Sequence, residues 1–100
     1  MAEEKPYVVR VDDNWHYMDQ SESYTDGGFD DCASAVAACK RMVDEFLAGN
    51  SGGTTTPDEL FRIYTAFGED PYVISNDPVC TFSAWDYARE RCRAIFEGRA

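Results

Sequence analysis

Residues 7–47 read YVVRVDDNWHYMDQSESYTDGGFDDCASAVAACKRMVDEFL, and this stretch decides the fold. It opens with a β-branched run, Tyr7–Val11, whose alternation is typical of a strand that helices cover on one face. After a polar, aromatic connection, Tyr24–Phe29 predicts the returning strand, and its two glycines indicate a bulge or a close backbone approach. An amphipathic helix follows, capped by one of the aspartates at 30–31 and ended by Gly49.

The apolar side chains of this helix recur at three- and four-residue spacing, which predicts that one stripe faces the sheet. The stripe consists of Val36, Cys39, Val43 and Phe46, with Met42 and Leu47 beside it. Residues 50–55 predict a flexible polar linker inside the domain. Thr56 then provides an N-cap, with Pro57 at the first helical position and Glu59 at the capping-box position, so a second helix begins there and ends at Gly68.

The rest of the chain adds a third strand and a third helix. Tyr72–Ile74 is a short β-branched and aromatic run after the helix exit Glu69-Asp70-Pro71, and Ser83 caps a last helix whose expected buried stripe includes Trp85. The order β-β-α-α-β-α predicts an α+β fold, with helices packed on one face of a small antiparallel three-stranded sheet. We expect one domain over residues 1–100, disorder in residues 1–6, and the third strand beside the first.

The chain is strongly acidic, with a formal net charge of −10 that is unevenly distributed. Residues 1–31 hold nine acidic and two basic side chains, whereas residues 83–100 hold three acidic and four basic ones. Direct nucleic-acid binding is therefore not expected, because it needs clustered Lys and Arg. A basic protein or a cation is the partner that this charge favours, although excess carboxylates also simply keep small proteins soluble.

The cysteines and the apolar runs predict a location in the cytoplasm. No segment resembles a secretory leader or a membrane span, so we expect all four cysteines to be thiols. Cys32 and Cys39 are two helical turns apart and cannot bridge each other. Cys39 and Cys92 suit buried helix faces, and Cys80 is the candidate for a reactive thiol. A zinc site is not expected, because no C-x-x-C pair occurs and the chain has one histidine.

One segment gathers aromatic rings among carboxylates and is the candidate binding surface. Turn chemistry explains the aspartates, but it does not call for three consecutive ring side chains. Glu69 and Asp70 join this surface if the first and third strands pair. The candidate binding residues are Asp12, Asp13, Trp15, His16, Tyr17, Asp19, Glu69 and Asp70. The spacing does not match a calcium-binding EF-hand loop, and an ordinary turn with rings packed over the sheet edge remains the alternative.

Three motifs resemble a family of small uncharacterised bacterial proteins. They are V-D-D-N-W-H-Y-M-D at Val11–Asp19, Y-T-A-F-G-E-D-P at Tyr64–Pro71 and F-S-A-W-D-Y-A-R at Phe82–Arg89. The resemblance spans nearly the whole chain. It implies a bacterial cytoplasmic origin and no particular activity, ligand or partner.

The sequence favours a non-catalytic interaction or regulatory module that binds a basic partner through this acidic, aromatic hairpin. We expect no catalytic residues, no metal, no cofactor and no membrane contact, and the oligomeric state is left open. The alternative is a small enzyme or metal-binding protein that uses Asp12, Asp13, His16, Asp19, Glu69 and Asp70. Mimicry of nucleic-acid charge toward a basic protein is a third interpretation. A serine hydrolase and a P-loop are not expected, because neither motif is present.

Overall fold

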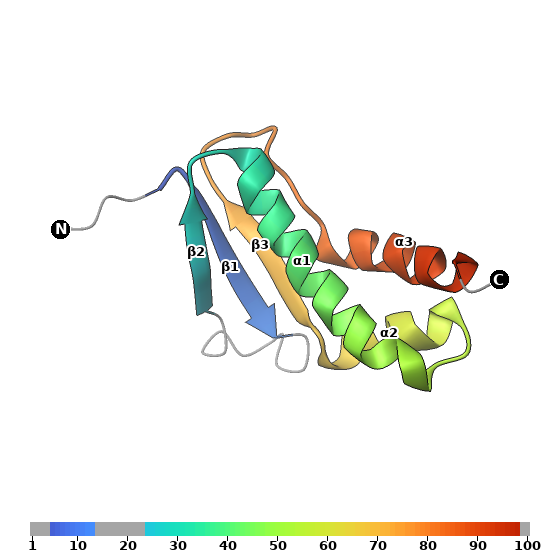
Figure 1. Ribbon diagram of the computed structural model, residues 1–100. Helices are drawn as coiled ribbons and strands as arrows, with labels where there is room; N and C mark the ends of the chain where they lie inside the picture. Colours follow the sequence, from blue (N-terminus) through green and yellow to red (C-terminus); the bar gives the residue numbers. More distant parts are fainter. Residues whose placement is uncertain (1–4, 14–23, 99–100) are drawn as a thin grey trace.

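The computed structural model describes residues 5–13 and 24–98, which form the α+β fold that the sequence predicts (Figure 1). The elements follow the predicted order β-β-α-α-β-α, with one short 3-10 helix added. They are β1 (Tyr7–Asp13), β2 (Tyr24–Phe29), α1 (Cys32–Asn50), η3 (Ser51–Gly53), α2 (Pro57–Phe67), β3 (Glu69–Ile74) and α3 (Ala84–Glu97).

β1 is the central strand of an antiparallel sheet with the order β2-β1-β3, so the predicted pairing of the first and third strands is confirmed. On β2, Gly27 is the partner of Val9, and the register shifts between Val9 and Arg10, where the glycines predict a bulge. On β3, Pro71 is the partner of Val11. Proline lacks an N–H donor, and it is accommodated here because β3 is an edge strand.

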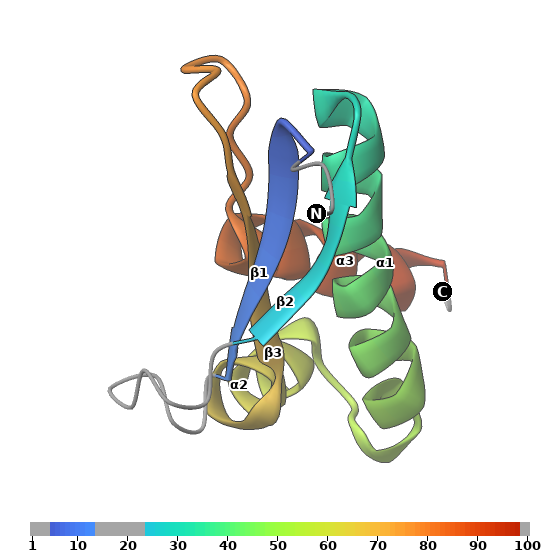
Figure 2. The same ribbon diagram turned by 90° about the vertical axis from the view of Figure 1, so that its left-hand side faces the viewer.

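α1 covers one face of the sheet, as Figures 1 and 2 show from two sides. Val9 and Val11 are fully buried against Ala35, Ala38 and Cys39 of this helix. The small alanine side chains let the helix backbone approach the strands closely. In the described part of the chain, no helix covers the opposite face.

A second apolar cluster lies beside β3, where α2 and α3 pack against the C-terminal half of α1. It consists of Val43, Leu47, Leu60, Tyr64, Ala84, Ala88 and Cys92. Tyr64 is fully buried, and its hydroxyl donates a hydrogen bond to the Glu69 carbonyl at 2.6 Å. This bond satisfies a buried polar group and fixes the start of β3 against α2.

Each of the three long helices begins at a side-chain cap that the sequence predicts. Asp31 Oδ1 accepts the Ser34 N–H at 2.7 Å, and Ser83 Oγ accepts the Asp86 N–H at 3.3 Å. At α2, Thr56 Oγ1 accepts a backbone N–H three residues along the chain at 3.2 Å. These caps satisfy N–H groups that have no partner within the helix.

Several predicted element ends are wrong by a few residues. β1 continues through Asp12 and Asp13, and β3 begins at Glu69 where a helix exit was expected. The two extensions pair with each other, so strand pairing overrides the turn preference of the acidic residues. α1 runs past Gly49 to Asn50, and η3 occupies the segment that was expected to be a flexible linker.

The predicted stripe of α1 is correct in part, because the helix runs along the strands and is longer than they are (Figure 1). Its 19 residues span about 28 Å. Cys39 faces the sheet as predicted, whereas Val43 and Phe46 belong to the cluster with α2 and α3. The Phe46 ring meets the Tyr64 ring edge-on at a centroid distance of 5.8 Å. Within the described ranges, no helix is long and apolar enough to cross a bilayer.

The expectation of four free thiols is wrong, because Cys32 and Cys80 form a disulfide. Cys32 is the first residue of α1, and Cys80 lies in the connection between β3 and α3, with a Cα–Cα distance of 5.8 Å. Helical spacing excludes a bridge between Cys32 and Cys39, but it carries no information about contacts between distant segments. Cys80 is therefore not a free reactive thiol. Cys39 and Cys92 are free and buried, as predicted.

Candidate functional site

The structure describes part of the predicted binding surface. Asp12, Asp13, Glu69 and Asp70 lie on β1 and β3. The other predicted members, Trp15, His16, Tyr17 and Asp19, lie outside the described residues. The geometric argument for this surface therefore rests on the paired ends of these two strands.

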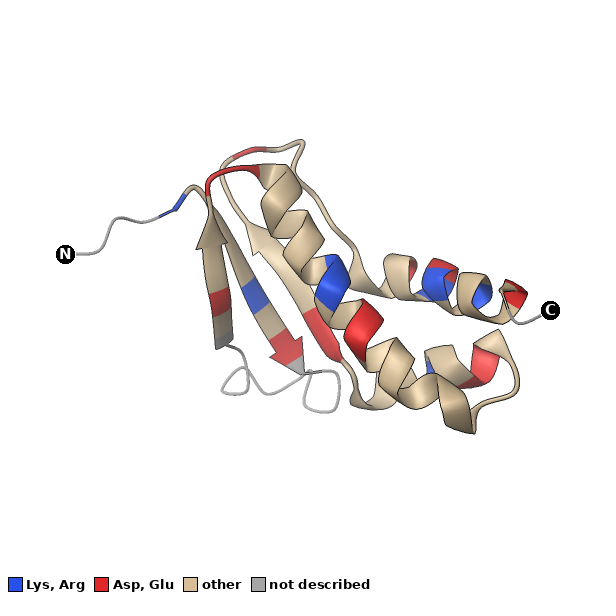
Figure 3. Ribbon diagram, viewed as in Figure 1, with Lys and Arg blue, Asp and Glu red and all other residues tan. Residues whose placement is uncertain are grey.

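Pairing of β1 with β3 brings the two acidic segments together. Asp12 is the partner of Asp70, and Asp13 is the partner of Glu69. We call these four residues the acidic strand pair. Figure 3 shows their red segments next to each other at one end of the sheet. The sequence predicted this proximity on the condition that the first and third strands pair, and that condition is met.

The Asp70 carboxylate is partly withdrawn from water. Burial raises the pKa of Asp70 above its ordinary value, and the negative charge of Asp12 raises it further. Asp12 in turn accepts a long hydrogen bond, 3.5 Å, from the Tyr72 hydroxyl. Among the described residues, the Asp70 carboxylate has no hydrogen-bond or ion-pair partner. A carboxylate of this kind beside a cleft is a candidate for ligand contact.

A cleft of about 330 Å³ connects Asp70 to the first turn of α3. We call it the β3–α3 cleft. Its lining consists of Asp70, Tyr72, Phe82, Ser83, Ala84 and Trp85. It therefore places aromatic side chains and one carboxylate around a space of side-chain size.

This cleft was not predicted from the sequence, because Trp85 was expected among the buried residues of the last helix. Trp85 is 43% exposed, and the buried positions of α3 are Ala84, Ala88 and Cys92. These three recur at strict four-residue spacing, which leaves the position after Ala84 at the border of the stripe. That spacing was the available signal for an exposed tryptophan.

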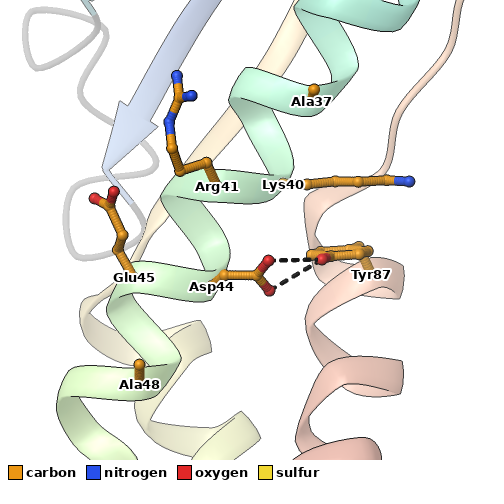
Figure 4. A pocket seen from close by; sticks show the side chains of 7 residues that line it. All are labelled: Ala37, Lys40, Arg41, Asp44, Glu45, Ala48 and Tyr87. Carbon is orange, nitrogen blue, oxygen red and sulfur yellow. Dashed lines mark hydrogen bonds between the residues drawn. The ribbon is translucent and has the colours of Figure 1, made fainter.

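A larger cleft of about 480 Å³ lies between α1 and α3, and its charged groups already bind one another (Figure 4). The Tyr87 hydroxyl hydrogen-bonds the two carboxylate oxygens of Asp44 at 3.0 and 2.9 Å. Arg91 Nε donates to Asp44 at 3.0 Å, and the Lys40 ammonium lies 5.5 Å from the centre of the Tyr87 ring. Burial and the Asp44 carboxylate raise the pKa of Tyr87. This network is a helix-to-helix contact with satisfied partners, so we do not select it as the site.

The described residues give no support to catalysis or metal binding. No group of three His, Cys, Asp or Glu side chains within residues 5–13 and 24–98 is arranged to hold a metal ion. Burial raises the pKa of the Cys39 thiol to about 11, and the negative charges of Asp26 and Asp70 add to this increase. Because the thiolate is the reactive form, this shift and the full burial of Cys39 do not favour it as a nucleophile at neutral pH. Ser83 is engaged as the cap of α3.

Comparison of the chain with family models, curated proteins and solved structures finds no match. The resemblance to a family of small bacterial proteins therefore stays an expectation. Two of its motifs, Tyr64–Pro71 and Phe82–Arg89, meet in space at the β3–α3 cleft, which contains Asp70 from one and Trp85 from the other. The function is consequently argued from geometry and charge.

Proposed function

We propose that this protein is a non-catalytic interaction module that binds a basic protein through the acidic strand pair. The observation that carries the proposal is the strand register, which sets Asp12 opposite Asp70 and Asp13 opposite Glu69. Four acidic residues thereby occupy four adjacent positions of one sheet end. The aromatic segment expected to add to this surface, Trp15–Tyr17, is separated from Asp13 by one residue, Asn14.

Like charges directly opposite each other repel across a sheet. A basic surface placed against the acidic strand pair relieves that repulsion. Electrostatic complementarity of this kind mainly sets the association rate and the specificity of a complex. It is also screened by salt over about 8 Å at physiological ionic strength.

The cytoplasmic location expected from the sequence is not part of this proposal. The Cys32–Cys80 disulfide is of a type that persists in oxidising compartments and is rare in the cytosol. A bacterial origin likewise rests on the motif resemblance alone. The proposal depends only on the charge and geometry of the sheet end, which are the same in either compartment.

The test measures binding of a fluorescent deca-lysine peptide by anisotropy between 20 and 200 mM salt. The triple variant Asp12→Asn, Asp13→Asn, Glu69→Gln removes three charges from the acidic strand pair. Its matched control removes three exposed charges from the helices through Glu45→Gln, Glu90→Gln and Glu97→Gln.

We expect the triple variant to bind roughly 10-fold more weakly than the control, corresponding to about 1.4 kcal/mol. Its affinity should also depend less on salt. Equal losses in both variants would mean that the peptide senses net charge alone, and the proposal would then be abandoned. Absence of peptide binding to the wild-type protein would have the same consequence.

A further inference from the structure

The β3–α3 cleft combines a carboxylate that has no partner among the described residues with exposed aromatic surface. Asp70 and Tyr72 come from alternate positions of β3, and Phe82 and Trp85 flank the start of α3. Trp85 meets the Phe61 ring edge-on at 6.4 Å and still leaves 43% of its surface exposed. Exposed indole surface next to a carboxylate suits a ligand that is both planar and positively charged.

We infer that the β3–α3 cleft binds one arginine side chain of the basic partner. This inference rests on the proposed function, since it names the side chain that such a partner inserts. A guanidinium can lie against the ring of Trp85 or Tyr72 while its N–H groups donate to Asp70. The volume of about 330 Å³ is at the lower limit for small-molecule pockets, so it accommodates one side chain better than a whole cofactor.

The charges around the cleft favour a cation over an anion. Asp12 is the strand partner of Asp70 and adds a second negative charge to this side of the sheet. The N-terminus of α3 contributes partial positive charge to the opposite wall. Asp86 lies in the first turn of α3 and offsets that contribution. An anionic ligand would have to approach the carboxylates of Asp12, Asp70 and Asp86.

Two of the chain's own arginines near these elements, Arg89 and Arg91, are engaged elsewhere. Arg10, the strand partner of Tyr72, adds one positive charge beside the cleft and lines a neighbouring hollow with Val8 and Ile74. The Arg89 guanidinium lies 4.9 Å from the centre of the Phe61 ring, and Arg91 is bonded to Asp44. A partner's arginine therefore does not displace an internal ion pair when it enters the cleft.

The test uses the full-length, ¹⁵N-labelled protein and two blocked tripeptides, acetyl-Gly-Arg-Gly-amide and its citrulline counterpart. Citrulline has nearly the same shape as arginine but no charge. The readout is the NMR signal of the Trp85 indole N–H, assigned with a Trp85→Phe variant. Asp70→Asn is the test variant, and Asp58→Asn on the exposed surface of α2 is its matched control.

We expect a saturable shift of the indole signal with the arginine peptide. Binding should be roughly 10-fold weaker with citrulline and in Asp70→Asn, because each removes a charge-assisted hydrogen bond. Asp58→Asn should bind as the wild type does. A second pair of variants is followed by the NMR signal of the Asp70 backbone amide. Trp85→Leu should lose binding, and Trp85→Phe should retain it. Superimposable spectra outside the cleft establish that each variant is folded.

The inference is overturned if arginine and citrulline shift the indole equally, or if Asp70→Asn binds as the wild type does. In that case selective loss of deca-lysine binding by the Asp12, Asp13 and Glu69 triple variant would still support the proposed function. Conversely, saturable arginine binding without that selective loss would leave the cleft as an arginine site and remove the acidic strand pair as the docking surface.

Discussion

Loss of the Cys32–Cys80 disulfide is expected to cause the largest decrease in unfolding free energy among the changes that we predict. The bond closes a loop with a sequence separation of 48 residues, which joins the start of α1 to the connection before α3. In the chain-entropy description, a loop of this length stabilises the folded state by about 4 kcal/mol at 25 °C. A domain of this size has a total unfolding free energy of roughly 5–15 kcal/mol, so the bond supplies a large share of it.

The prediction is tested by urea unfolding, followed by circular dichroism, of the oxidised protein, the reduced protein and the Cys32→Ser, Cys80→Ser double variant. Given a typical urea m-value, the loss should lower the unfolding midpoint by roughly 2 M. Reductant should have no further effect on the double variant, which serves as the control. Freshly purified protein, denatured without reductant, should contain two titratable thiols, those of Cys39 and Cys92. Four thiols, or a midpoint that reductant does not change, would refute the reasoning.

Burial of the Asp70 carboxylate and the surroundings of two glycines also predict changes in stability. Asp70→Asn should raise stability at neutral pH. The folded-state pKa of Asp70 is above its unfolded value, so the wild-type protein loses stability as pH rises through these two values. The stability gained by Asp70→Asn should therefore disappear in acid, where the wild-type carboxyl is protonated. Unfolding measured as a function of pH would show this. Gly68→Ala should destabilise by about 1–3 kcal/mol, because the new Cβ would lie 2.6 Å from the Tyr64 ring and 2.8 Å from its carbonyl oxygen. Gly49→Ala is the matched substitution on α1, where a Cβ meets nothing within 4 Å, and it should stabilise the protein by up to about 1 kcal/mol. Melting curves in which Gly68→Ala is more stable than Gly49→Ala would contradict both predictions. Trp15 lies outside the described residues, and its exposure stays a prediction. Acrylamide should quench its fluorescence efficiently in a variant that lacks Trp85. Weak quenching would remove Trp15 from the predicted binding surface.

The sequence alone determined the features that depend on neighbours along the chain. The caps at Asp31, Thr56 and Ser83 were predictable because a cap satisfies N–H groups two or three residues away. The bulge beside Gly27 and the alternation of β1 were predictable for the same reason, since both depend on a few consecutive residues. Together these local signals were sufficient for the element order and the fold class.

The candidate site was only partly predictable, because it joins segments that are far apart in the chain. The acidic residues of β1 and β3 were identifiable individually, and only the sheet register set Asp12 opposite Asp70. The β3–α3 cleft needed the packing of α3, which buries Ala84 and leaves Trp85 at the rim. Neither result follows from periodicity, which reports the faces of one element and not the element that covers them.

The disulfide shows the same limit most clearly. Cys80 was assigned to a connection from its local sequence, and that assignment was right. Its distance from Cys32 is fixed by how the connection between β3 and α3 passes the start of α1, and a bridge requires Cα atoms within about 7 Å. The sequence thus determined what each segment is, through contacts between near neighbours. Only the tertiary structure decided which distant segments touch, because burial of the two apolar clusters sets that choice and no short stretch of sequence contains it.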